Sequence, residues 1–549
     1  MPLQKNQILT LRIERLSSDG SGVAHSADGE AVFVPGTAPG DEAQVRIVKD
    51  CRRYAFGILD MLLTPSPDRI PVDCAVAGPC GGCSLRHLDY TAELRAKQEN
   101  VADAFARIGG LDVPVLDIVP SPEVDRYRNK VQFPVGLDKN GTPCIGFYAG
   151  RTHRIVPCPD CRLQPGVLND IGSALCAFFA EKGIQPYNEE TGTGLVRHIF
   201  LRRGVHSGQI MVCLVCTRAK LPCAEELCAR LQAQFPAIAT ILLNVNSKNT
   251  NVILGAETRT LTGPGYIEDT LAGVPVRLGP LSFYQVNTLA AERLYGIAAG
   301  FAQLQPTDLL LDLYCGMGTI GLSMAEHCRE LVGVEIVPEA IDSAKANAAR
   351  MGADVVAKSR FFCADAGQAA TRLAAEGLHP DVVMLDPPRK GCDEATLSAV
   401  VRMAPRRVVY VSCNPATAAR DAAWLEQHGY HAEKVQPVDL FPRTKHCECV
   451  IALSKGEIDS KKVRVEFSLE GMDTSGLQKG ATYPEIKARV LEQTGLKVSS
   501  LYISQVKQKC GLEVRENHHK ATSENTKQPQ CPKEKEDAIV EALKHFQMI

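Results

Sequence analysis

Residues 309–321 read Leu-Leu-Leu-Asp-Leu-Tyr-Cys-Gly-Met-Gly-Thr-Ile-Gly. An apolar run leads into a cluster of glycines, so the segment predicts a strand, a tight loop and the start of a helix. Such a loop brings backbone N–H groups close to a bound cofactor. Gly316, Gly318 and Gly321 also match G-x-G-x-x-G, which leaves a nicotinamide dinucleotide site open, because this pattern alone has low specificity.

Apolar strands continue beyond this loop and alternate with helical stretches such as 339–350. The expected strands are 309–313, 331–334, 382–385, 408–411 and 450–453. This order predicts an α/β fold with a parallel, doubly wound, Rossmann-like sheet. Glu335 ends the second strand, where a carboxylate can accept hydrogen bonds from ribose hydroxyls.

Two further polar residues lie at the predicted carboxyl edge of the sheet, and a third precedes the last strand within reach of the same pocket. Asp386 begins Asp-Pro-Pro after the strand 382–385, which is typical of S-adenosylmethionine enzymes and not of dehydrogenases; a helix cap is the alternative role. Cys413 lies at the end of the strand 408–411, and as a nucleophile for an electron-poor ring carbon it needs partial exposure and a lowered pKa. Glu448, just before the last strand, is the candidate base. A buried structural thiol and a solvated surface carboxylate are the alternatives for Cys413 and Glu448.

Five motifs together identify a family. They are Phe283-Tyr-Gln-Val-Asn287, Asp312-Leu-Tyr-Cys-Gly316, Asp386-Pro-Pro-Arg-Lys-Gly391, Ser412-Cys-Asn-Pro415 and Phe441-Pro-Arg-Thr-Lys-His-Cys-Glu448. In this order they resemble the RNA uracil-C5 methyltransferases over roughly residues 8–455. The resemblance includes the amino-terminal region, where Ala31-Val-Phe-Val-Pro-Gly36 is similar to the family's TRAM domain. It implies a class I methyltransferase domain that uses S-adenosyl-L-methionine.

The resemblance also implies roles for individual residues. Cys413 adds to C6 of uracil, C5 then takes the methyl group, and Glu448 removes the C5 proton. Phe283 is the matching aromatic that would hold a splayed-out uridine, with a core Phe as the alternative. The cofactor contacts implied by the motifs are Gln285, Tyr314, Gly316, Gly318, Glu335, Asp365 and Asp386. Arg443 and Cys447 depart from the family pattern, which usually has His and Val at these positions.

A cysteine cluster precedes the sheet. It comprises Cys74, Cys80, Cys83, Cys158 and Cys161. Cys80, Cys83, Cys158 and Cys161 could bind zinc, whereas Cys74, Cys80, Cys83 and Cys161 could bind a four-iron, four-sulfur (4Fe-4S) cluster, and spacing alone favours neither. The resemblance implies the iron–sulfur site, because ribosomal-RNA members of the family carry one. It therefore also favours 23S ribosomal RNA as substrate, with transfer RNA as the alternative. The Cys-x3-Cys-x2-Cys spacing of radical enzymes is absent at Cys74, which favours a structural or RNA-positioning cluster.

Composition limits the cellular context. The 549 residues include 61 Lys and Arg against 63 Asp and Glu, so RNA must be met by local basic patches. The 21 Cys, with neither an apolar span nor an export signal, favour a cytoplasmic protein without membrane association. We expect a monomer.

The chain is expected to divide into four parts. Residues 1–63 predict an OB-type barrel of about five short strands, either an RNA platform or a scaffold without ligand. Residues 64–280 predict a mixed α/β central domain, and 281–455 the methyltransferase domain. In 456–549, a capping box at Thr482 and Glu485 predicts a possible helix-turn-helix, with plain packing as the alternative, and the polar segment 517–535 predicts a loop.

RNA contacts are expected at local basic groups. The candidates are Lys49, Arg52, Arg53, Arg126, Arg128, Lys130, Arg197, His198, Arg202 and Arg203. Two other functions remain open. Methylation of an exocyclic amine would require an aromatic residue where Arg389 stands, and a non-catalytic RNA-binding factor would retain the fold without turnover.

Overall fold

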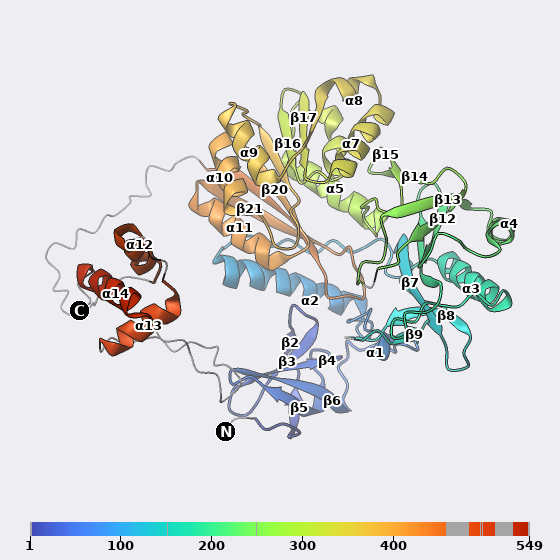
Figure 1. The fold of residues 1–549 in the computed structure, drawn as a ribbon, viewed down its shortest axis with the longest axis horizontal. Coiled ribbons are helices and arrows are strands. Elements are labelled where there is room, and N and C mark those ends of the chain that lie inside the picture. The colour runs from blue at the N-terminus through green and yellow to red at the C-terminus, as the bar shows by residue number, and fades with distance from the viewer. Residues whose placement is uncertain are drawn as a thin grey trace. The chain divides into compact units, whose positions relative to one another are not determined.

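The computed structural model describes residues 3–150, 152–248, 250–456, 483–494, 496, 498–510 and 531–546. The chain divides into two compact units, Met1–Asp459 and Ser460–Ile549. In Figure 1 the first unit runs from blue to orange, and the helices of the second are red. All five motifs lie in the first unit.

The first unit begins with a small all-β region, the amino-terminal sheet. Its strands are β1 (Ile8–Arg12), β2 (Arg15–Leu16), β3 (Ser21–His25), β4 (Ala31–Pro35), β5 (Glu42–Asp50) and β6 (Tyr54–Thr64). They pair in the order β1-β5-β6-β4-β3-β2. In β5, alternate residues Ala43, Val45 and Ile47 are fully buried, as expected of a strand with one face on a core. The predicted short strands are therefore present, with two-residue β2 in addition.

A second, central sheet follows. Its strands are β7 (Lys130–Leu137), β8 (Pro143–Tyr148), β9 (Ile155–Pro157), β10 (Val196–Arg203), β11 (Ile210–Cys216), β12 (Ile238–Val245) and β13 (Glu257–Thr262). They pair in the order β13-β12-β11-β10-β7-β8-β9. Helices α3 (Gly166–Glu181) and α4 (Ala224–Gln234) cover its core with apolar side chains such as Leu168 and Leu227. The hairpin of β14 (Ile267–Leu271) and β15 (Val274–Leu278) leads to the third sheet.

The third sheet spans residues 309–455. Its strands are β16 (Leu309–Leu313), β17 (Glu330–Glu335), β18 (Ser359–Cys363), β19 (Val382–Leu385), β20 (Arg407–Ser412), β21 (Tyr430–Val438) and β22 (Glu448–Lys455). Their order is β18-β17-β16-β19-β20-β22-β21. β16 to β20 are parallel, as predicted, but β22 is antiparallel to both neighbours. Only the expected direction of the last strand was wrong, because β22 follows β21 through one loop and reverses its direction.

Helices cover both faces of the third sheet (Figure 1). They are α5 (Thr288–Ala302), α6 (Thr319–Ser323), α7 (Pro338–Met351), α8 (Ala353–Lys358), α9 (Ala366–Ala375), α10 (Glu394–Met403) and α11 (Pro415–Gln427). Neighbouring residues of one strand point into different cores: Leu310 packs with α5 and α7, whereas Leu309 and Leu311 pack with α9, α10 and α11. This two-sided burial confirms the doubly wound class and explains the continuous apolar strands.

Helix α2 (Tyr90–Asp103) precedes the central sheet in sequence but packs on the third sheet. It begins at Asp89, whose side chain accepts a hydrogen bond from Thr91 N at 2.9 Å. The π-helical turn Ala104–Gly109 continues it, and Val101 and Phe105 join the core of α9 to α11. Residues 64–280 thus contribute to two cores.

The second unit contains α12 (Tyr483–Thr494), α13 (Ser500–Lys509) and α14 (Lys533–His545) around a small apolar core. The capping pair Thr482 and Glu485 lies outside the described side chains. The predicted loop 517–535 was wrong for its last residues, because α14 starts at Lys533 and buries Ile539 and Leu543. Over the part of the chain that the structure describes, no helix is both long and apolar enough to cross a membrane.

Candidate active site

The loop after β16 uses backbone conformations that favour glycine. Gly316 and Gly318 have φ of +55° and +79°, and Tyr314 shares the left-handed region at +66°. A Cβ on Gly318 would lie 3.1 Å from a side chain of α7, and one on Gly321 would lie 2.7 Å from Asp312 Oδ2. Gly321 N instead donates to that oxygen at 3.0 Å. The start of α6 is therefore held tightly against β16 at the carboxyl edge of the sheet.

Glu335, the last residue of β17, closes this glycine loop. Its Oε2 accepts a hydrogen bond from Gly316 N at 3.1 Å. Its Oε1 accepts from Ile336 N at 2.8 Å and Val337 N at 3.0 Å, while both apolar side chains are exposed. The carboxylate thus has a fixed orientation at the position where doubly wound folds bind ribose.

Asp386 and Asp365 have different surroundings. Burial raises the pKa of Asp386 to about 7. Asp386 is not a helix cap, because no backbone N–H among the described residues donates to it, and Asp393 caps α10 by accepting from Thr396 N at 2.8 Å. Asp365 is the N-cap of α9 and accepts from Gln368 N at 3.1 Å. Asp365 is therefore held by its own helix, whereas the Asp386 carboxylate is available to a ligand.

Phe283 and Gln285 lie between β15 and α5. Asn129 anchors this segment, since its Nδ2 donates to Gln285 O at 2.7 Å and to Thr288 Oγ1 at 2.9 Å. Asn287 caps α5 with its side chain. The Phe283 side chain is 74% exposed, so the alternative of a core Phe was wrong and the ring is available for stacking.

Strand register brings Cys413 and Glu448 together. β20 and β22 are antiparallel neighbours in which Ser412 pairs with Cys449. One residue further, Cys413 leaves β20 beside Glu448, which begins β22 and pairs with Val438 of β21. Cys413 is half-buried and Glu448 is 6% exposed. The antiparallel last strand, which was not expected, is what sets the carboxylate beside the thiol.

The pKa values at this pair differ in part from expectation. Burial raises the pKa of the Cys413 thiol, and Glu448 and Asp386 raise it further. The predicted lowering of this pKa was therefore wrong, although the predicted partial exposure was right. Burial raises the pKa of Glu448 to about 8, with a further contribution from Asp386. A carboxyl group with such a pKa can exchange a proton near neutral pH.

Arg389 is a functional candidate that sequence reasoning missed. Its side chain contacts Cys413 and lowers the pKa of both Cys413 and Glu448, opposing burial. Its backbone is held by the helix that follows β20, since Asn414 Nδ2 donates to Arg389 O at 2.9 Å. A guanidinium near a thiol and a carboxyl group favours their ionised forms. The Asp386-Pro-Pro-Arg motif could have indicated Arg389. From sequence, this position was used only as evidence against methylation of an exocyclic amine, which would require an aromatic residue there.

Several basic residues expected to contact RNA are structural. Arg202 is fully buried and donates to two carbonyls of the loop 279–282, each at 2.7 Å. Arg197 is buried and donates to carbonyls of the loop 246–248 at 3.1 and 2.6 Å. Burial lowers the pKa of His198 to about 4, so its ring is neutral. These expectations were wrong because Arg197 and Arg202 are buried and donate to backbone carbonyls of two loops, and burial leaves His198 uncharged.

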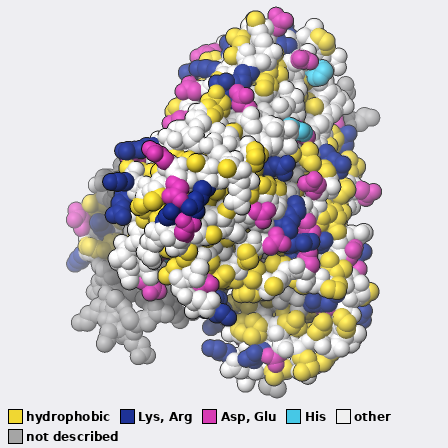
Figure 2. Space-filling view, turned by 90° about the vertical axis from the view of Figure 1, so that its right-hand side faces the viewer, with side chains coloured by type: hydrophobic (Ala, Val, Ile, Leu, Met, Phe, Trp, Pro, Cys, Tyr) yellow, Lys and Arg dark blue, Asp and Glu magenta, His cyan; other side chains and the backbone are white. Residues whose placement is uncertain are grey.

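The amino-terminal sheet exposes an apolar surface. The rings of Phe33, Tyr54 and Phe56 lie 5.6 to 5.9 Å apart between centroids. The exposed large apolar side chains of this sheet are Ile8, Val48, Tyr54, Phe56, Ile58, Met61 and Leu63. Figure 2 shows apolar atoms gathered at the bottom of the molecule, where Figure 1 places β5 and β6. Lys49, Arg52 and Arg53, predicted to contact RNA, are exposed near the start of β6.

The cysteine cluster lines one cavity of about 390 Å³. The thiols in its wall belong to Cys74, Cys80, Cys83, Cys158 and Cys161. Residues about 75 positions apart in sequence are thus brought together, and both alternative ligand sets lie in the same wall. In the described ranges, no three His, Cys, Asp or Glu side chains are arranged to hold a metal ion. The structure therefore gives a thiol-lined cavity and no preformed ion site.

Positive charge surrounds these thiols. Arg86, Arg128 and Lys130 line the same cavity, so the two predicted substrate contacts Arg128 and Lys130 lie in its wall. Arg86 donates to the carboxylates of Asp73 and Asp125, and burial lowers the pKa of Lys130 to about 8. Burial raises the pKa of Cys80 and Cys83, whereas Arg86 and Arg128 oppose this rise at Cys83 and also favour the ionised form of Cys161. Several thiols in one wall are the kind of donor set that holds a thiolate-bound group.

Two family descriptions match the chain. Residues 2–59 match the TRAM domain, and residues 276–456 match the tRNA (uracil-5-)-methyltransferase family. An RNA methyltransferase of Halalkalibacterium halodurans, described as uncharacterized, is 42% identical over 453 residues, which are 82% of this chain and 98% of the relative. A similarly described protein of Clostridium tetani is 40% identical over 454 residues, which are 83% of this chain and 98% of that relative.

One solved structure is similar over most of the chain. It is the Pyrococcus abyssi tRNA (uracil-54, C5)-methyltransferase in complex with S-adenosyl-L-homocysteine. The TM-score is 0.65 at 27% identity, and the match covers 81% of this chain and 99% of that one. Neither of the two family matches extends into the second unit.

Proposed function

This chain belongs to the S-adenosylmethionine-dependent RNA uracil-5-methyltransferases, and we propose that it methylates C5 of a uridine in 23S ribosomal RNA through a covalent adduct between Cys413 and C6. The β20–β22 register that sets Glu448 beside Cys413 carries this proposal. A nucleophile and a base at one sheet edge fit uracil chemistry. Methylation of an exocyclic amine needs neither a thiol nor this base.

The glycine loop and its neighbours fit S-adenosylmethionine, which supplies the methyl group when bound. Gly316 and Gly318 would present backbone N–H groups, and Glu335 would accept hydrogen bonds from ribose hydroxyls. Gln285, Tyr314 and Asp386 are the remaining proposed contacts. Asp365 is a weaker member of this set, because its carboxylate already caps α9.

The proposed chemistry uses two side chains in sequence. The Cys413 thiolate forms a bond to C6 of uracil, and the C5–C6 electron pair becomes available at C5, the carbon that is methylated. Glu448 then removes the proton from methylated C5. The electron pair of that C–H bond restores the C5–C6 double bond, the C6–S bond breaks, and the thiolate leaves. Arg389 would stabilise the anionic forms of both side chains during these steps.

RNA recognition is proposed at two places. A uridine in folded RNA must be splayed out to reach a thiol, and the exposed ring of Phe283 offers a stacking surface for it. Unpaired flanking bases would stack on Phe33, Tyr54 and Phe56. The nearby Lys49, Arg52 and Arg53 would contact the phosphates.

The thiol-lined cavity supports the 23S assignment, because ribosomal-RNA members of the family carry an iron–sulfur site of this kind. Cys74, Cys80, Cys83 and Cys161 would hold the cluster, and Cys158 would not be a ligand. The thiols in one wall and the surrounding cations favour an anionic thiolate-bound cluster. The main alternative substrate is transfer RNA, on which the similar Pyrococcus abyssi enzyme acts according to its name.

Iron analysis tests the cluster. Protein purified without oxygen is expected to contain about four irons per chain and to absorb at about 400 nm. Cys83→Ser should lose most of the iron, whereas the matched variant Cys158→Ser should retain it. Zinc in place of iron, or loss of iron in Cys158→Ser, would contradict the ligand set.

The pH dependence tests the ionisation of the proposed base. Glu448, with a pKa of about 8, must be ionised to accept a proton, and Cys413, with a raised pKa, must be ionised to attack. Both charged forms become more populated as pH rises. We therefore expect kcat, which includes the late proton removal by Glu448, to increase by roughly tenfold or more between about pH 6 and pH 9. A profile that is flat or falls over this interval would contradict both assignments.

A further inference from the structure

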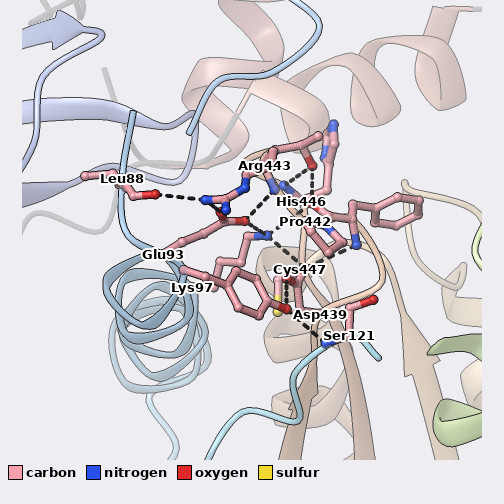
Figure 3. A network of polar contacts seen from close by, with 12 residues as sticks. Leu88, Glu93, Lys97, Ser121, Asp439, Pro442, Arg443, His446 and Cys447 are labelled. Atoms are coloured by element: carbon pink, nitrogen blue, oxygen red, sulfur yellow. Dashed lines mark hydrogen bonds and ion pairs between the residues drawn. The ribbon is translucent and has the colours of Figure 1, made fainter. Parts of the chain in front are cut away.

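A buried ionic network joins α2 to the loop that precedes Glu448 (Figure 3). Lys97 Nζ lies 2.7 Å from Glu93 Oε1 and 2.8 Å from Asp439 Oδ1. The three side chains are at most 2% exposed. Tyr90 on the same helix donates to Asp439 Oδ2 at 2.9 Å. Because removing such charges from water is costly, a buried network of this kind is weak evidence for a purely stabilising role.

The network binds the backbone of the base loop, residues 439–447. Lys97 Nζ donates to Phe441 O at 3.2 Å, and Phe441 N donates to Asp439 Oδ1 at 3.1 Å. Arg443 N donates to Glu93 Oε1 at 2.8 Å. Three backbone groups of the loop therefore depend on a network centred on one lysine of α2.

The base loop contains a strained residue at its centre. Arg443 has φ of +67°, in the left-handed region that a non-glycine residue adopts only at an energetic cost. Its guanidinium donates to Leu88 O at 2.8 Å, and Leu85 N donates to Arg443 O at 3.1 Å. Tyr127 Oη donates to Pro442 O at 3.0 Å. Contacts from outside the loop thus hold a conformation that the loop would not favour alone.

The base loop leads directly to Glu448, the proposed base, which is the first residue of β22. It connects β21 to β22, and Val438 and Glu448 form the strand pair that closes it. A general base must lie within hydrogen-bond distance of the proton that it removes. A displacement of about 1 Å can lower the rate by about 100-fold.

We propose that Glu93, Lys97 and Asp439 are positioning residues that hold the base loop so that Glu448 reaches the C5 proton of the methylated uridine adduct. This inference rests on the proposed function, in which Glu448 is the base. Lys97 touches no reacting atom and acts through the loop backbone. Disturbing the network should therefore slow proton removal more than the earlier bond formation at Cys413.

The double variant Lys97→Met, Glu93→Gln tests the positioning role. It removes one positive and one negative charge, so the net charge of the protein is unchanged. The substrate is 23S ribosomal RNA transcribed with tritium at C5 of uridine, assayed well below the unfolding temperature of each variant. We expect at least tenfold slower tritium release per folded molecule, with a denaturation-stable protein–RNA adduct accumulating. Proportionate loss of adduct and of tritium release would instead indicate a general structural role and overturn the inference.

Two single-residue comparisons keep the test independent of folding. Glu93→Gln retains an oxygen for Arg443 N and should keep most activity, whereas Glu93→Ala should accumulate adduct. Asp308→Asn removes a buried carboxylate that contacts Arg406 elsewhere in the same fold, and it should lower the unfolding temperature without adduct accumulation. Equal behaviour of Glu93→Ala and Asp308→Asn would refute the positioning role.

Wild-type protein and Glu448→Gln separate this inference from the proposed function. If Glu448→Gln accumulates adduct and the network variants do not, the positioning role fails while the base assignment stands. If Glu448→Gln turns over normally, the base assignment fails, and the positioning role fails with it.

Discussion

Replacing Cys413 by Ala is expected to reduce 5-methyluridine formation at least about 1,000-fold, because the variant lacks the only atom in the proposed chemistry that bonds to C6. Binding of S-adenosylmethionine and RNA should change little, since the proposed contacts of both lie on other residues. The measurement is a single-turnover assay of labelled methyl transfer into RNA, combined with equilibrium titration of cofactor and RNA.

Cys449→Ala is the matched control. Cys449 is a fully buried thiol one residue after Glu448, and its loss should leave methylation within a few-fold of wild type. Substantial 5-methyluridine formation by Cys413→Ala would remove the nucleophile assignment. Loss of RNA and cofactor binding in that variant would show a structural thiol instead.

Replacing Glu448 by Gln is expected to slow turnover by about 100- to 10,000-fold, because an amide cannot accept the C5 proton. The thiol and the cofactor loop are unchanged, so bond formation at C6 and methyl transfer should proceed once per enzyme molecule. The stalled product is a methylated adduct that survives denaturation. Gel analysis with labelled RNA and mass spectrometry of the Cys413 peptide detect it.

Glu433→Gln serves as the control for Glu448→Gln. Glu433 lies on β21 and pairs with Arg407, away from the thiol. Its replacement should leave turnover within a few-fold of wild type, since ion pairs of this kind contribute little. Rapid turnover by Glu448→Gln without adduct would assign the base to another residue.

The fold of the third sheet could be largely predicted from sequence. Strands such as Leu309–Leu313 are buried on both faces, so their residues are continuously apolar and mark the strand directly. β21 was missed because its sequence, Tyr-His-Ala-Glu-Lys-Val-Gln-Pro-Val, mixes exposed and buried residues at the sheet edge. The direction of β22 was also missed, since an apolar run does not encode strand direction.

The candidate site could be predicted from sequence where a motif residue directly follows a predicted strand. Asp386 and Cys413 follow parallel neighbours β19 and β20, so their meeting at one edge follows from topology. The partnership of Glu448 with Cys413 depends on antiparallel register, which one sequence does not reveal. The raised pKa of Cys413 depends on burial beside Glu448 and Asp386, which are distant in sequence.

Long-range polar contacts were the least predictable feature. Lys97 reads as one charge of an amphipathic helix, yet it binds Asp439 across 342 residues of sequence. Arg202 reads as a surface cation, yet it lies buried beneath the loop 279–282. Asp439 pairs with Lys97, and two loop carbonyls accept hydrogen bonds from Arg202. These partners are distant in sequence and come close only when the chain folds.

The most direct test of the central claim is transfer of a labelled methyl group from S-adenosylmethionine to 23S ribosomal RNA lacking 5-methyluridine, followed by nucleoside analysis. Unmodified transfer RNA and Cys413→Ala are assayed in parallel. The account predicts label in 5-methyluridine of ribosomal RNA, and none with Cys413→Ala. Label in transfer RNA alone would contradict the substrate assignment, and label on an exocyclic amine, or full activity of Cys413→Ala, would contradict the chemistry.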